Sequence, residues 1–136
     1  MTTVEKRIID VPQIYPKMGA YSNAIEVRGG RTIYLSGVVG AYPDGTLPKG
    51  DIALQADLAY RNLAEVMRVA GGSLADIVKV TILVGEDYPT HAKTLREVRA
   101  RHFPDGDFPT STLMRVAGFA GPDYLFEIEA IAVLPD

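Results

Sequence analysis

Hydrophobic and polar positions in the first part of the chain follow the short patterns of β-strands, interrupted by turn residues. Stretches rich in β-branched residues predict strands at 4–11, 23–28 and 31–38. Gly29-Gly30 separates the last two strands, and a two-residue glycine turn is typical of a β-hairpin. The pattern therefore predicts that 23–28 and 31–38 pair as a hairpin.

The pattern becomes helical at Asp51, where hydrophobic residues begin to recur every three or four positions. Asp51 suits an N-cap, and Gly71-Gly72 suits a C-terminal stop, so one long helix is predicted between them. The rest of the chain predicts a buried strand at 77–85, a basic amphipathic helix at 88–103 and two strands at 112–118 and 124–134. Leu95, Val98 and Phe103 are expected to face inward from this second helix.

This order of elements predicts an α+β fold in which both helices pack on one face of the sheet. A strand, a long helix and another strand imply a crossover connection. The opposite face of the sheet would need a cover, which self-association could supply. With 136 residues and no visible linker or repeat, the chain is predicted to form a single domain over residues 1–136.

The composition is that of an ordinary globular protein, with 47% hydrophobic and 23% charged residues. The absence of cysteine excludes disulfides, thiolate nucleophiles and thiolate zinc sites. No stretch has the character of a signal peptide or a membrane span, so a cytoplasmic location is predicted. A net charge of -3 argues against a general affinity for nucleic acids, and nucleic acid is an unlikely partner.

Metal and nucleotide sites find little support in the residue spacing. His91 and His102 are eleven positions apart without a clustered acidic partner, and both are expected to be solvated helix residues. The paired glycines fit neither a P-loop nor a dinucleotide-binding fingerprint, and no serine lies in a GxSxG elbow. Neither a metal site nor a nucleotide cradle is predicted.

Two stretches near the C-terminus carry polar groups of interest. In "FPTSTLMRVAG", three hydroxyl side chains stand between a proline and a predicted strand, and the residues alone fit either a site or a strand entrance. In "LFEIEAIAV", Glu127 and Glu129 are two residues apart, so in a strand their side chains lie on the same face. The side chains of Phe126, Ile128 and Ala130 would lie on the opposite face. Such carboxylates are either solvated or ion-paired structural residues, or functional groups at an interface.

Four segments in this order resemble the RidA family, also called YjgF or L-PSP, from about Tyr15 to Val133. They are "MGAYSNAI", "IYLSGVVG", "GGSLADIVKVTILV" and "FEIEAIAV". The resemblance implies a six-stranded mixed sheet with two helices on one face, similar to chorismate mutase of the trimeric kind. It also implies a homotrimer with ligand clefts between subunits, hydrolysis of enamines or imines to ammonia and a keto acid, and no cofactor.

The resemblance assigns roles to individual residues. Glu127 would orient or activate water, which suits attack on an electrophilic imine carbon, and Glu129 would serve structure or an interface ion pair. The expected ligand-binding positions are Tyr21, Ser36 and Gly37, with backbone groups around Ser111, Thr112 and Leu113 lining a wall of the cleft.

Two departures from the family pattern point to a different substrate. Ser111 stands where deaminating members carry an arginine that grips the substrate carboxylate, and Arg96 stands where an asparagine is expected. One hypothesis is that Arg96 reaches the cleft and replaces the missing guanidinium. The alternative is that Arg96 is solvated like Arg99 and Arg101.

The preferred interpretation is thus a diverged RidA-family deaminase that acts on a small enamine, imine or related reactive intermediate. A second interpretation is a non-catalytic trimer that binds a small metabolite or a protein partner in the same clefts. A remote third is an endoribonuclease, in which the basic second helix contacts RNA phosphates.

Overall fold

The chain forms its strands and helices in the predicted order. The structure is a computed structural model that describes residues 3–104 and 106–136. The elements are β1 (Glu5–Ile9), β2 (Ala24–Arg28), β3 (Arg31–Val39), α1 (Ile52–Ala70), a 3-10 helix (Leu74–Asp76), β4 (Ile77–Val84), α2 (Tyr88–His102), β5 (Thr110–Arg115) and β6 (Phe126–Leu134). As expected, Asp51 caps α1 by accepting from the backbone N–H of Leu54, and Gly71 ends the helix in the left-handed conformation.

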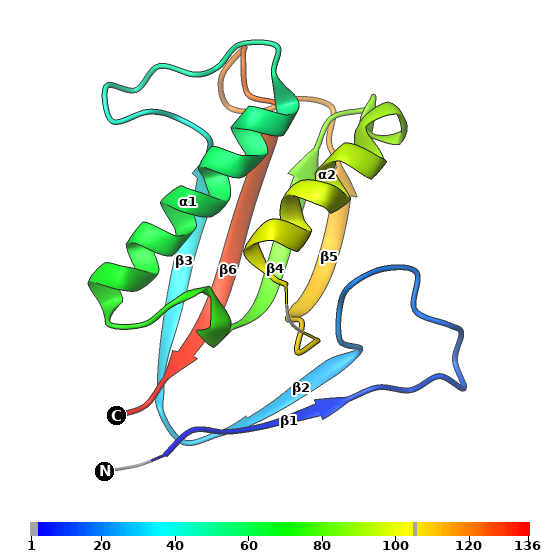
Figure 1. Ribbon diagram of the computed structural model, residues 1–136, viewed down its shortest axis with the longest axis vertical. Helices are drawn as coiled ribbons and strands as arrows, with labels where there is room; N and C mark the ends of the chain where they lie inside the picture. Colours follow the sequence, from blue (N-terminus) through cyan, green and yellow to red (C-terminus); the bar gives the residue numbers. More distant parts are fainter. Residues whose placement is uncertain (1–2, 105) are drawn as a thin grey trace.

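Four strands form the main sheet in the order β3-β6-β4-β5. β6 runs antiparallel to both neighbours, while β4 and β5 run parallel, so the predicted mixed sheet is confirmed. Both helices lie on one face of this sheet, as predicted (Figure 1). Leu63 and Met67 of α1, Ile128 of β6 and Val84 of β4 are fully buried and belong to one hydrophobic core.

The expected six-stranded sheet and its hairpin at Gly29-Gly30 are wrong for this structure. β2 pairs with β1 in a separate two-stranded ribbon, and β3 pairs with β6. Gly29 and Gly30 have φ values of 76° and 79°, which redirect the chain between β2 and β3. A Cβ at Gly30 would overlap the carbonyl of Leu134 and the side chain of Val4, so this bend needs glycine.

The ribbon crosses the lower end of the sheet in Figure 1 and reaches the start of β5. Ser22, just before β2, makes this connection: its N–H donates to the carbonyl of Pro109 at 3.2 Å, and its hydroxyl donates to that of Phe108 at 2.6 Å. The ribbon therefore carries the segment before Ser22 to the β5 edge of the sheet.

His102 is not a solvated residue, contrary to the prediction. Its ring stacks on Tyr60 of α1 with centroids 5.0 Å apart, and its Nε2 lies 2.8 Å from a carboxylate oxygen of Asp57. The His102 and Asp57 side chains are only 16% and 14% exposed. The contact joins the end of α2 to α1. His91, at the other end of α2, is partly exposed beside Asp87.

The Asp57 carboxylate should make the stability of the protein depend on pH. Burial by itself would raise the pKa of Asp57, but the hydrogen bond with His102 and the positive charge of Arg61 outweigh burial and hold the pKa below 3.8. A depressed pKa stabilises the folded state above the unfolded-state pKa, and this contribution is lost as the pH falls through the folded-state pKa.

We therefore expect the stability advantage of the wild type over Asp57→Asn to shrink as the pH falls below about 4. Urea unfolding of both proteins at a series of pH values measures this advantage as a difference in the free energy of unfolding. A difference that stays constant across the series would contradict the prediction.

Candidate functional site

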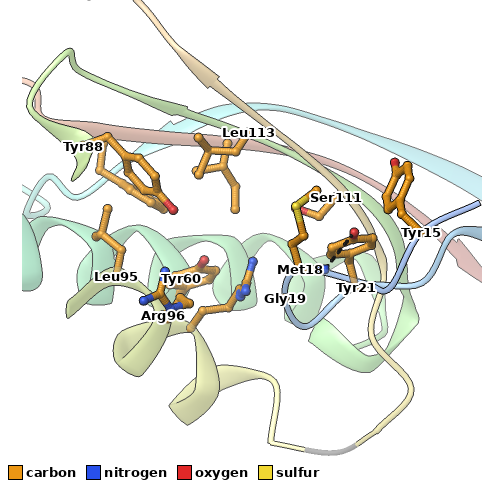
Figure 2. A pocket seen from close by; sticks show the side chains of 13 residues that line it. Tyr15, Met18, Gly19, Tyr21, Tyr60, Tyr88, Leu95, Arg96, Ser111 and Leu113 are labelled. Carbon is orange, nitrogen blue, oxygen red and sulfur yellow. Dashed lines mark hydrogen bonds between the residues drawn. The ribbon is translucent and has the colours of Figure 1, made fainter. Parts of the chain in front are cut away.

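A cavity of about 320 Å³ lies where α2, β5 and the loop before β2 meet. Four of the predicted substrate-binding residues line it: Tyr21, Arg96, Ser111 and Leu113. Figure 2 shows their side chains arranged around the cavity together with Tyr15, Tyr60 and Tyr88. The structure thus brings together residues from the loop, the second helix and the fifth strand.

Local structure explains how these residues reach the cavity. Ser111 and Leu113 lie in register with Val80 and Ile82, whose side chains are buried beneath the helices, so both β5 residues face the helical side. Tyr21 is held by its hydroxyl, which accepts a hydrogen bond from the backbone N–H of Met18 at 3.3 Å. These contacts fix one wall and one corner of the cavity.

Tyr60 adds a buried hydroxyl from α1. Its side chain is 2% exposed and lines the cavity. Burial raises the pKa of Tyr60 far above its usual range, and the positive charge of Arg99 opposes this rise only in part. The phenol therefore stays protonated and can donate a hydrogen bond.

Glu127 lies on the opposite face of the sheet. Its neighbours Phe126 and Ile128 are buried toward the helices, so the predicted alternation along β6 is confirmed, and the structure shows that the face of Glu127 is the uncovered one. Gly37 lies directly against it, at an irregularity of β3, and a Cβ at this position would overlap the carboxylate. A glycine is therefore required here if the carboxylate is to keep its place.

The remaining predicted residues also lie outside the cavity. Ser36 is exposed beside Gly37 in the same irregular part of β3. Thr112 lies in register with Thr81, which in turn pairs with Glu129, so these three residues share the uncovered face. A single chain consequently holds two groups of candidate residues, separated by the thickness of the sheet.

Sequence reasoning missed several residues of the cavity. Arg99 lines it together with Arg96, although it was grouped with the solvated arginines. The sequence does indicate this position for Arg99, because it follows Arg96 by three residues, and residues three apart share one face of a helix. Tyr15, Tyr60 and Tyr88 carried no comparable signal, since tyrosines in loops and amphipathic helices usually serve packing.

Within residues 3–104 and 106–136, no three histidine or acidic side chains converge in a way that could hold a metal ion. Among the helices of the same residues, none is long and apolar enough to cross a membrane. The candidate residues themselves present guanidinium and hydroxyl groups in the cavity and a carboxylate on the uncovered face.

Residues 13–134 match the family model described as Endoribonuclease L-PSP. The chain belongs to this family, also called RidA or YjgF. Two curated RidA-family relatives are named 2-iminobutanoate/2-iminopropanoate deaminase. The rat protein is 34% identical and the human protein 32% identical, each over 98% of this chain and 93% of the relative.

A solved structure supports the RidA fold of the chain. The crystal structure of YyfB from Yersinia pestis, described as a protein of unknown function of the conserved Rid family, aligns with a TM-score of 0.87. The two are 30% identical, and the alignment covers 95% of this chain and 98% of the Yersinia chain. The family resemblance inferred from the four sequence segments is thus confirmed.

Proposed function

We propose that this RidA-family chain is a hydrolytic deaminase that acts on a small enamine or imine. The observation that carries the proposal is the Glu127 carboxylate, held against Gly37 on a sheet face that no helix of the described residues covers. The names of the rat and human relatives support the same class of reaction.

The reaction needs one positioned water and one group that moves a proton. Glu127 accepts a proton from water as the water oxygen bonds to the imine carbon. Glu127 returns this proton to the imine nitrogen, which gives a neutral carbinolamine. Glu127 then takes the proton of the carbinolamine hydroxyl and passes it to the amino nitrogen as the carbon–nitrogen bond breaks, and the products are a keto acid and ammonia. Glu127 is regenerated, and the balance is one imine and one water for one carbonyl product and one ammonia.

The separation of the two residue groups supports a site formed between copies of the chain. In one chain, Glu127 and Gly37 lie on the uncovered face, whereas Tyr21 and Ser111 lie on the helical side. A homotrimer would bring the uncovered face of one copy to the cavity of the next. Large exposed side chains on this face, such as Tyr34 at 78% exposure, fit burial by association.

Ser111 supports a substrate that differs from those of arginine-bearing members. A serine offers one neutral donor, so a carboxylate held there would lose the stronger charge-assisted bond of a guanidinium. In this proposal, Arg96 supplies that positive charge from α2, on the cavity wall that it shares with Ser111.

The test is imine hydrolysis by the purified protein. An amino-acid oxidase generates 2-imino acids in situ, semicarbazide traps those that remain, and ammonia is followed in parallel. We expect the protein to decrease semicarbazone formation and accelerate ammonia release relative to buffer. Light scattering of the same sample should give about 44 kDa, three times the 14.7 kDa of one chain.

If no imine from a broad panel reacts faster than in buffer, the deaminase proposal fails. A non-catalytic trimer that binds a metabolite in the same clefts would then be the better account.

A further inference from the structure

Two arginines reach the same cavity from one helix. Arg96 and Arg99 are three residues apart on α2, so their side chains leave one face of the helix with Cβ atoms about 5–6 Å apart. Nη2 of Arg99 would lie 3.7 Å from a Cβ at Gly19, which places this guanidinium against the loop that closes the cavity. Figure 2 shows Arg96 on the helical side, near Tyr60.

Within the described part of the chain, neither guanidinium is paired with a carboxylate. The ion pairs of the structure that involve arginine use Arg7, Arg61 and Arg68. The arginines of α1 differ from Arg96 and Arg99 in this respect. Arg61 pairs with Asp57, and Arg68 pairs with Glu65, each within the same helix. Within one chain, none of the described residues that line the cavity is acidic. In the proposed trimer, the Glu127 carboxylate of the next copy also faces the cavity, where its partner is the attacking water and not an arginine.

The other walls suit a short carbon chain with polar ends. Leu95 and Leu113 supply apolar surface, while Tyr21, Tyr60 and Tyr88 supply hydroxyl groups around it. A cavity with apolar walls and a few polar groups is the usual form of a small-molecule site. Two guanidinium groups in such a site favour a negatively charged ligand, because each can bind one carboxylate through two parallel hydrogen bonds.

We propose that the cavity binds a ligand with two negative charges, of the class of dicarboxylic 2-keto or 2-imino acids. This inference rests on the proposed deaminase function and names its substrate class. A single carboxylate would satisfy one guanidinium and leave the second charge uncompensated nearby. A second carboxylate on the same chain compensates it, and the apolar wall accommodates the carbons between the two groups.

Titration calorimetry tests the proposal with 2-oxoglutarate as the dicarboxylate, 2-oxobutanoate as the monocarboxylate and inorganic phosphate as a compact dianion. We expect the wild type to bind 2-oxoglutarate about tenfold or more tightly than 2-oxobutanoate. Arg96→Ala and Arg99→Ala should each remove most of this preference. Arg101→Ala is the matched control, because it removes the same charge from an exposed position of α2 outside the cavity.

Three results would overturn the inference. These are equal affinity for the two keto acids, a preference that survives both cavity variants, or phosphate binding more tightly than 2-oxoglutarate. Circular dichroism of each variant verifies that it is folded, which is expected because Arg96 is exposed and Arg99 half-buried.

Kinetics separate this inference from the proposed function. The imine of L-glutamate, generated by a glutamate oxidase, is compared with the imine of 2-aminobutyrate. Selective, arginine-dependent binding of 2-oxoglutarate without hydrolysis of either imine would refute the deaminase and retain the dianion site. Hydrolysis that favours the 2-aminobutyrate imine would retain the deaminase and refute the dicarboxylate assignment.

Discussion

The Glu127→Gln variant is expected to hydrolyse imines with a kcat about 100-fold or more below that of the wild type, because a positioned general base contributes on the order of 10²–10⁴-fold. Glutamine keeps the shape of the side chain beside Gly37 but cannot accept the proton of the attacking water. The measurement is the initial rate of ammonia release at saturating imine, with unfolding by urea to verify that stability is unchanged.

Glu129→Gln is the matched control for this variant. Glu129 lies two residues farther along β6, on the same face, and is exposed. Its substitution removes the same charge from the same strand, so a general electrostatic effect would appear in both variants. A Glu127→Gln variant with wild-type kcat, or an equal loss in both variants, would exclude Glu127 as the proton acceptor.

Periodicity was sufficient to predict the helices and the strands that bury hydrophobic side chains. The alternation of residues along β6 is enough to predict that Glu127 and Phe126 lie on opposite faces, as they do in the structure. The same rule applied to β5 would have separated Thr112 from Ser111 and Leu113, because neighbours in a strand face opposite sides. The backbone groups of all three can line one cleft wall, but their side chains face opposite sides of the sheet.

The ribbon and His102 show where local patterns were ambiguous. Two glycines between strands fit a tight hairpin, but they equally allow a bend that sends β2 away from β3, and tertiary contacts such as those of Ser22 decide between them. His102 lies seven residues after Leu95 and four after Val98, on the buried stripe of α2. The sequence does not reveal that Asp57 and Tyr60 face its ring, so burial of this histidine cannot be predicted from the sequence alone.

The division of the candidate site between two faces could not be predicted from order along the chain. Residues of one functional site need only meet in the assembled protein, and sequence spacing carries no information about which copy contributes them. Arg96 and Ser111 line one cavity within a single chain, whereas Glu127 lies on the other face of the sheet and would reach them from a second copy in the proposed trimer. The proposed intersubunit cleft is the arrangement that reconciles these positions.

Replacement of Gln55 by leucine is expected to lower the free energy of unfolding by about 3 kcal/mol, because each buried backbone group left unpaired costs about 1–3 kcal/mol. Gln55 is a fully buried polar residue on the core face of α1. Its Nε2 donates to the carbonyls of Pro48 and Asp123 at 3.2 and 3.0 Å, and its Oε1 accepts from the N–H of Leu125 at 2.9 Å. Leucine would fill the space of the glutamine side chain but would form none of these three hydrogen bonds.

Urea unfolding measures the effect, and Glu65→Leu is the control. Glu65 is exposed on the same helix, so its replacement by the same residue should change stability by less than about 1 kcal/mol even though its pair with Arg68 is lost. The same three bonds fix the loops before α1 and before β6 to the helix. We therefore expect hydrogen exchange at Leu125 to increase in Gln55→Leu. An unchanged stability would show that burial of leucine offsets the lost hydrogen bonds, contrary to this expectation.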